Sequence, residues 1–235
     1  MISTSNYVAR KYGVRAAMPG YLGQTLVKEL SGGKENLEFV KSDFALYKRK
    51  SAETRAVLEQ YDPNLKMYSL DEAYMDIGPY LEVQLMEKGL SHERIHQQLL
   101  TSHGGNEQSS ADDEPSQKKT KGEKKSIAEL FPLASIHNAA KALLNSIRQR
   151  VKDTTGLTCS AGLASNFLLA KISSDINKPN GQYFVPPSEQ DILAFLHPLS
   201  VRKVSAQRCD LCQDDYDSLN LLCLTFILLS FTMRS

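Results

Sequence analysis

The stretch Lys66-Met67-Tyr68-Ser69-Leu70-Asp71-Glu72-Ala73-Tyr74-Met75-Asp76-Ile77 decides the fold of this chain. Apolar, β-prone runs flank the adjacent carboxylates Asp71 and Glu72, which predicts an antiparallel hairpin with both at its tip. Neighbouring carboxylates repel each other, and a divalent cation that prefers oxygen ligands, such as Mg²⁺, neutralises them. A solvated polar turn is the alternative, and the dipeptide alone favours it because turns are normally polar.

Composition indicates a globular protein with one large domain or two small ones. The chain has 235 residues, of which 41% are hydrophobic, enough for a packed core. Its formal net charge of +1 is too small to indicate nucleic-acid binding, so any such surface must come from local clusters of charge. The apolar run 219–231 is shorter than the roughly 20 residues of a membrane span, so we expect no membrane partner.

The four cysteines do not form the pattern of a secreted disulfide framework. Cys209 and Cys212 have the spacing of metal ligands, but no second pair and no nearby histidine pair completes a zinc site. Chance spacing is therefore the favoured interpretation. An unrelated metal protein built on this pair remains a remote alternative.

Helical and strand periods alternate along the chain, which predicts a mixed α+β sheet. We expect Asn6 or Ser5 to cap the first helix, and Ser42 and Ser165 to cap later ones. The expected elements are two short helices in 1–30, a strand at 37–40, a helix from 42 to about 61, a helix with a stripe at Ile136, Ala140, Leu143, Ile147 and Val151, a buried strand at 157–164, a helix from 165 to about 176, and a strand at 182–185.

Residues 81–130 have a different composition from the rest. Residues 81–100 suggest a polar helix, and 103–125 are so rich in Gly, Ser, Asp, Glu and Lys that we expect a disordered linker. The basic tract Lys118–Lys125 is suited to contact phosphates or to act as a nuclear import signal. A solvated linker is the favoured alternative, since blocks of charge are usually just that.

A cationic cluster is expected near the start of the chain. Tyr7, Arg10 and Lys11 are spaced i, i+3 and i+4, so a helix would place them on one face, with the hydroxyl of Thr4 just ahead. A phenol, a guanidinium and an ammonium together suit a triphosphate. An ordinary cationic helix surface is the alternative.

Several segments, in this order along the chain, resemble motifs of the Y-family (translesion) DNA polymerases: Ser3–Arg10, Tyr12–Gly20, Ser69–Tyr74, Cys159–Ala164, Leu169–Ile172 and Asn177–Gln182. The resemblance covers residues 1 to about 205, with an unmatched insertion in the middle. It implies a nuclear enzyme that uses Mg²⁺ for template-directed nucleotidyl transfer past damaged bases. The implied partners are a dNTP and a damaged DNA primer-template, and no sliding-clamp motif is apparent.

The resemblance also assigns roles to individual side chains. It implies that Asp71 binds both Mg²⁺ ions and that Glu72 lies beside the ion that activates the primer 3′-hydroxyl. Two such cations lower the pKa of that hydroxyl and neutralise the leaving pyrophosphate. Ser69 and Asp76 are expected to support the hairpin, and Tyr74 to lie in the core. The implied ligands of the dNTP triphosphate are Thr4, Tyr7, Arg10 and Lys178, and the role of the matched Lys171 stays open.

By the same resemblance we divide the chain into 1–61 (fingers and adjoining helix), 62–80 (palm hairpin), 81–130 (insertion, largely a disordered linker), 131–205 (palm continuation) and 206–235 (divergent tail). The expected fold is α+β, with a partial palm, small helical fingers, and no thumb or little finger. The family's first palm strand carries a further metal-binding Asp within an Asp-x-Asp-x-Phe-type motif, and we expect it to lie outside this sequence.

Two consequences are expected if the first palm strand, the thumb and the little finger are missing. The two-ion Mg²⁺ site would lack one family ligand, and the grip on DNA would be weakened, so we expect this chain alone to polymerise feebly or not at all. The alternative function is a catalytically inactive nucleotide- or partner-binding fragment with a regulatory role.

Overall fold

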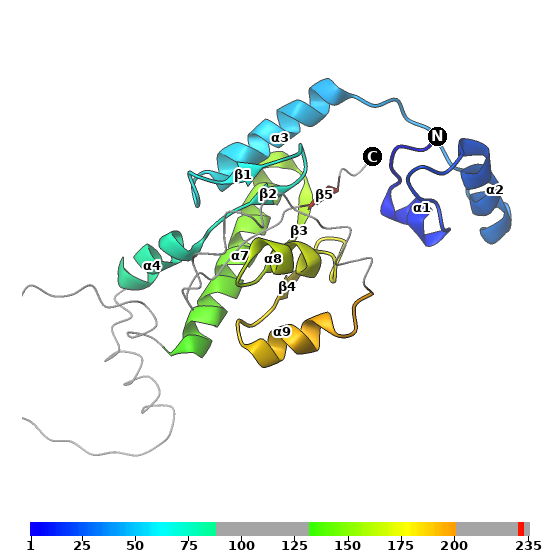
Figure 1. The fold of residues 1–235 in the computed structure, drawn as a ribbon. Coiled ribbons are helices and arrows are strands. Elements are labelled where there is room, and N and C mark those ends of the chain that lie inside the picture. The colour runs from blue at the N-terminus through cyan, green and yellow to red at the C-terminus, as the bar shows by residue number, and fades with distance from the viewer. Residues whose placement is uncertain (88–131, 201–229, 233–235) are drawn as a thin grey trace, which may run out of the picture.

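A computed structural model describes residues 1–87, 132–200 and 230–232 of the chain. Its elements, labelled in Figure 1, are α1 (Tyr7–Lys11), α2 (Gly20–Leu30), α3 (Phe44–Leu58), β1 (Lys66–Met67), β2 (Ala73–Tyr74), α4 (Gly78–Glu87), α7 (Leu133–Thr155), β3 (Thr158–Leu163), α8 (Phe167–Ser174), β4 (Gln182–Phe184), α9 (Glu189–Leu196) and β5 (Ser230–Thr232). Within these ranges no helix is both long enough and apolar enough to cross a bilayer.

The long helix α7 is the centre of the fold. Its buried stripe is Ile136, Ala140, Leu144, Ile147 and Val151, which confirms the predicted helical period except that Leu144, rather than the half-buried Leu143, completes it. The stripe packs in one core with residues of α3, the hairpin, α4 and β3. Gly156 follows the helix with a φ of 73°, a left-handed conformation that favours glycine at a helix end.

The sheet against α7 is mixed, as predicted. Its strand order is β4-β3-β5, with β4 parallel and β5 antiparallel to β3. The central strand β3 is almost wholly buried, and α8 packs closely on it. At Gly162 an added Cβ would lie 1.9 Å from the carbonyl oxygen of Ala170, so only glycine permits this approach of helix and strand.

Cys159 lies in β3 and is buried as a free thiol. Burial raises the pKa of this thiol to about 12, against the opposing effect of the Arg148 charge. The thiol therefore behaves as a small apolar core group.

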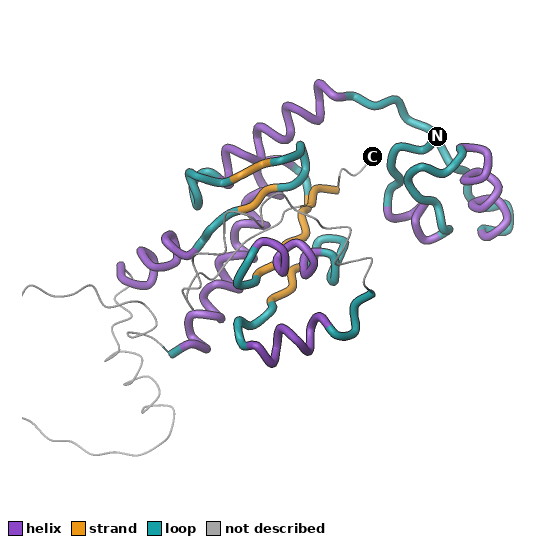
Figure 2. The backbone as a smooth tube through the Cα atoms, viewed as in Figure 1, coloured by secondary structure: helices purple, strands orange, loops and turns teal. Residues whose placement is uncertain are grey.

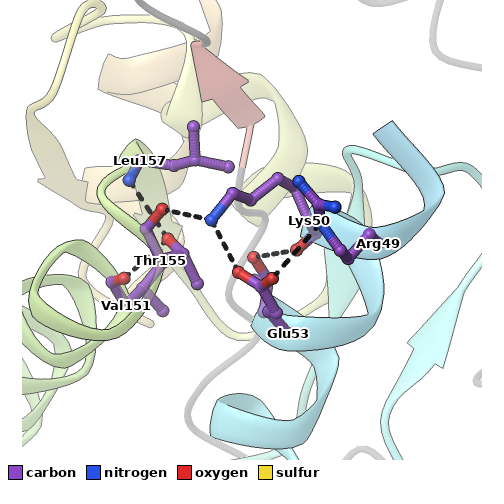
Figure 3. Close-up of polar contacts among 7 residues, drawn as sticks. Arg49, Lys50, Glu53, Val151, Thr155 and Leu157 are labelled. Carbon is purple, nitrogen blue, oxygen red and sulfur yellow. Dashed lines mark hydrogen bonds and ion pairs between the residues drawn. The ribbon is translucent and has the colours of Figure 1, made fainter. Parts of the chain in front are cut away.

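Besides apolar packing, polar contacts join α3 to the end of α7 (Figure 3). The ammonium of Lys50 donates to the carbonyl oxygen of Thr155 at 3.0 Å and to Glu53 Oε2 at 2.7 Å. The Thr155 hydroxyl in turn donates to the carbonyl of Val151 at 2.7 Å and accepts from Leu157 N at 3.1 Å. A cation at the C-terminus of a helix interacts favourably with its dipole, so Lys50 stabilises the end of α7 as well as its contact with α3.

Residues 1–40 form a unit of their own, which we call the N-terminal unit. Its core consists of Ile2, Ala9, Val14 and Val27, with Leu37 packed against them. The tube drawing shows α1 and α2 set apart from the remaining elements and joined to α3 by a loop (Figure 2). We call those remaining elements, from α3 onward, the body.

Several local predictions were wrong. No strand forms at 37–40, because Leu37 packs onto α2 while Phe39 and Val40 are exposed. Asp43 and Asn166, each one residue later than predicted, cap α3 and α8, whereas Asn6 caps α1 as expected.

Other elements were not predicted or lie outside the described residues. The helix α9, capped by Ser188, and the strand β5 in the divergent tail were not predicted. The predicted polar helix at 81–100 corresponds to α4 up to Glu87, and its remainder lies outside the described residues. The linker at 103–125 and the pair Cys209 and Cys212 lie outside them too.

Candidate functional site

An antiparallel hairpin forms as predicted, but its strands have two residues each and a five-residue connection replaces the expected tight turn. The pairs Lys66↔Tyr74 and Met67↔Ala73 define its register, and residues 68–72 connect the strands, so both carboxylates lie in the connection. Asp62 closes the base, since its Oδ2 accepts from the backbone N of Asp76 at 2.9 Å. The hairpin is thereby fixed to the turn that follows α3.

The two adjacent carboxylates have different surroundings. Asp71 is exposed, and its Oδ1 accepts a hydrogen bond of 2.8 Å from the hydroxyl of Ser69. Glu72 is half-buried, and its Oε2 lies 2.5 Å from the ammonium of Lys171 on α8. Ser69 thus supports the hairpin tip, as predicted, and Lys171 is the partner that neutralises Glu72.

Lys171 and Tyr74 dock the hairpin on α8. The Lys171 ammonium lies 5.9 Å from the centre of the Tyr74 ring, and that ring meets Phe167 edge-on at a centroid distance of 5.3 Å. Tyr74 is 2% exposed, which confirms that it belongs to the core. Because a charged pair at Glu72 and an aromatic pair at Tyr74 both join the hairpin to α8, the tip has a defined position relative to that helix.

The described residues supply only part of a metal site. Asp71 and Glu72 offer the hard oxygen ligands that Mg²⁺ prefers. However, one Glu72 oxygen is already paired with Lys171, and no group of three or more His, Cys, Asp or Glu side chains within these ranges is placed to hold an ion. This donor set does not by itself fit a two-ion centre.

In the N-terminal unit, the predicted neighbours Tyr7 and Arg10 do lie together. The Arg10 guanidinium stacks 5.0 Å from the centre of the Tyr7 ring, and its Nε donates to the carbonyl of Ser5 at 2.9 Å. Asn6 caps the helix by accepting from Ala9 N at 2.9 Å. Thr4 is exposed and lies two residues before the cap Asn6, so its position beside the Tyr7 and Arg10 pair stays a prediction.

Lys178 lies in a tight turn between α8 and β4. Its ammonium is 2.5 Å from Asp175 Oδ1, and its side chain is 22% exposed. Lys178 belongs to the body, whereas Tyr7 and Arg10 belong to α1 of the N-terminal unit. Their shared role as phosphate ligands stays a prediction.

Sequence reasoning missed two features of this region. The pairing of Glu72 with Lys171 joins residues 99 positions apart, and the contacts of Arg148 to the Lys178 turn span more than 30 positions. The only local signal was the presence of Lys171 in a matched segment, and it gave no partner.

Comparison with known proteins agrees with the motifs. Residues 1–175 match the impB/mucB/samB family. Among similar proteins, DNA polymerase kappa of Caenorhabditis elegans is 36% identical over 207 residues, which cover 87% of this chain and 34% of that protein. DNA polymerase kappa of Homo sapiens is 35% identical, with coverage of 87% and 25%. DNA polymerase IV of Francisella tularensis subsp. holarctica is 32% identical, with coverage of 87% and 41%.

Solved structures of polymerases resemble this chain as well. An insertion ternary complex of Dbh DNA polymerase and the crystal structure of DinB from Sulfolobus solfataricus each superpose with a TM-score of 0.53 at 22% identity, covering 84% of this chain and 40% of the other. At this identity the likeness concerns the fold alone. The chain spans about a third or less of the length of its polymerase kappa relatives.

Proposed function

Because the chain belongs to the impB/mucB/samB family of Y-family DNA polymerases, we propose that it provides the fingers and part of the palm of a translesion DNA polymerase. The reaction is transfer of a nucleotide from a dNTP to the primer end opposite a damaged template base, in the nucleus. The observation that carries the proposal is the hairpin tip, where two adjacent carboxylates are held on a rigid body and one of them stays exposed.

Mg²⁺ is the cofactor that this proposal implies. Asp71 and Glu72 are the described side chains that would contribute oxygen ligands, and a bound Mg²⁺ would neutralise charge on the transferred phosphates. For Glu72 to contribute its paired oxygen, that oxygen must exchange the Lys171 ammonium for the ion. Lys171 therefore neutralises the charge of Glu72 while no cation is bound.

The dNTP triphosphate is proposed to be held from two sides. On one side, Arg10 is oriented by Ser5 and by the Tyr7 ring, with Thr4 adjacent. On the other side, Lys178 stands in its turn on the body and would exchange Asp175 for a phosphate oxygen. Charge-assisted hydrogen bonds of this kind are about twice as strong as neutral ones, so each contact contributes measurably to affinity.

One observation favours a second candidate function. Within residues 1–87 and 132–200, only part of a metal donor set is present, and one of its two carboxylates is paired with a lysine. A chain that binds a nucleotide without transferring it would suit such a site. This candidate is an inactive nucleotide- or partner-binding fragment with a regulatory role.

The test is Mg²⁺-dependent dNTP binding by the purified chain, measured by calorimetry, with wild type compared to Asp71→Ala and Arg10→Ala. We expect each substitution to weaken binding at least about tenfold, since each removes a charged contact. The control is Lys28→Ala, an exposed cation at the far end of α2. Equal losses in the control, or no binding by wild type, would contradict the proposed nucleotide site.

Primer extension with the same proteins separates the two candidates. Extension that Asp71→Ala abolishes supports the polymerase. Binding without extension supports the inactive nucleotide-binding fragment.

A further inference from the structure

The guanidinium of Arg148 is the best-connected cation among the described residues. It projects from α7, and all three of its nitrogens donate hydrogen bonds. Nε donates to the carbonyl of Cys159 in β3 at 3.0 Å, and Nη1 to Gln182 Oε1 at 3.2 Å. Nη2 donates to both the carbonyl oxygen and the side-chain Oδ1 of Asn180, at 2.6 and 2.9 Å.

The turn that Arg148 contacts is constrained on other sides too. Gln182 Nε2 donates to the carbonyl of Lys141 on α7 at 3.0 Å, and Asn177 Nδ2 donates to the carbonyl of Gln182 at 2.8 Å. An added Cβ at Gly181 would lie 2.1 Å from the carbonyl oxygen of Asn177, so the turn is tight. These contacts fix residues 177–182 against α7 and β3.

Asn180 has a φ of 53°, a left-handed conformation that asparagine adopts more readily than most residues other than glycine. Arg148 donates hydrogen bonds to both the main-chain carbonyl and the side-chain oxygen of Asn180. An ionic donor therefore adds to asparagine's own tolerance of this conformation and fixes the residue in place. Lys178 is only two positions before it.

We propose that Arg148 is a positioning residue that sets where the Lys178 ammonium stands, so that it meets the triphosphate of the incoming nucleotide. This inference rests on the proposed function. Arg148 acts through the turn and does not itself contact the nucleotide. A lysine would not replace it, because a planar guanidinium donates along several fixed directions and an ammonium does not.

A role in stability alone would have a different signature from a positioning role. Loss of four hydrogen bonds from a half-buried group would lower stability in either case. If Arg148 positions Lys178, in contrast, substitution of Arg148 weakens nucleotide affinity only when Lys178 is present. A double-mutant cycle measures this dependence directly.

The experiment measures Mg²⁺-dependent dATP affinity of the whole chain for wild type, Arg148→Met, Lys178→Ala and the double variant. We expect Arg148→Met and Lys178→Ala each to weaken binding about tenfold, and the double variant to be no weaker than Lys178→Ala alone. Arg148→Lys should recover little of the loss. Arg150→Met, an exposed arginine on the same helix, is the matched control and should bind as wild type does.

Amide hydrogen exchange of residues 177–182 gives an independent readout. It should quicken in Arg148→Met and not in Arg150→Met. If Arg148→Met does not fold, Asn180→Gly replaces it, because glycine accepts the positive φ while the side-chain acceptor of Arg148 is lost. This variant should weaken binding less, and again only when Lys178 is present.

The outcomes are distinct. An equal loss of affinity with and without Lys178, or no loss in Arg148→Met, would overturn the proposal. A wild-type chain that binds no dATP would overturn the proposed function, and with it the link to the triphosphate. Unchanged exchange in residues 177–182 would overturn the claim that Arg148 holds the turn, whatever the binding result.

Discussion

The N-terminal unit and the body bury their apolar side chains very differently. The body has a large core that joins α3, the hairpin, α4, α7 and β3, and a second cluster around Leu169 and Val185 that joins α8 to α9. The N-terminal unit has a small cluster around Val14 and Val27, and it leaves Tyr21, Phe39 and Val40 exposed. We infer that the carboxylates and Lys178 are carried by a rigid scaffold, whereas Tyr7 and Arg10 are carried by a unit of lower stability. Segments that bind ligands are often drawn from the less stable parts of a protein.

The largest expected effect comes from adding a methyl group at the point where β3 and α8 pack together. In Gly162→Ala, the new Cβ would lie 1.9 Å from the Ala170 carbonyl and 2.7 Å from the Ser174 nitrogen, and both are backbone atoms. We expect a loss of about 3 kcal/mol or more in the free energy of unfolding of the body, measured by urea titration. Gly156→Ala is the control within the body, since it has open space around it and a φ of 73°, and should cost about 1 kcal/mol. A body that tolerates Gly162→Ala as well as the control would show that β3 and α8 are not packed so closely.

A matched pair of valines tests whether the body is more stable than the N-terminal unit. Val151 lies in the body and is fully buried, and Val27 lies in the N-terminal unit at 3% exposure. We expect Val151→Ala to cost about 2–3 kcal/mol of global stability, because its cavity lies in a dense core. We expect Val27→Ala to cost about 1 kcal/mol and to quicken amide exchange in α1 and α2 only. Equal losses, or exchange that quickens throughout the chain with Val27→Ala, would mean that the two regions unfold as one unit.

The smallest expected effect is a pH dependence confined to the body. Burial, and then the nearby charge of Lys141, lower the pKa of His137 on α7 from its usual 6.5. The unfolded chain therefore binds this proton more readily than the folded one, so stability is full above pH 6.5 and falls as pH drops toward the lowered pKa. Urea midpoints between pH 7.5 and 5 should fall less in His137→Gln than in wild type. Identical pH profiles for the two proteins would contradict this assignment.

Local sequence patterns were enough to predict much of the body. The stripe on α7, the small-residue strand β3 and the hairpin are each defined by neighbours in sequence. The strand expected at 37–40 was wrong because a strand needs a partner, and Leu37 packs on the N-terminal cluster instead. Helix α9 was overlooked although Ser188 has the pattern of an N-cap, with Glu189 and Asp191 in the first turn.

The candidate site was predictable only in its separate parts. The tip carboxylates and the stacked Tyr7 and Arg10 follow from short spacings. The partner of Glu72 and the anchor of the Lys178 turn do not, because they depend on how α8 and α7 pack against distant segments. Residue types can indicate which side chains bind phosphate, but packing decides which side chains hold them in place.

The buried thiol of Cys159 can report when the body opens. With a pKa of about 12 the thiol is almost wholly protonated at neutral pH, with a thiolate fraction of about 10⁻⁵. An alkylating reagent reaches it only after β3 leaves the core, so the rate of labelling at Cys159 equals the rate of opening when the reagent reacts faster than the body recloses. Fraying of α1 and α2 leaves that rate untouched, since Cys159 packs in the body core and not in the N-terminal cluster. A fast reagent, with labelling at Cys159 measured by peptide mass spectrometry, therefore reports the opening of the body independently of the N-terminal unit.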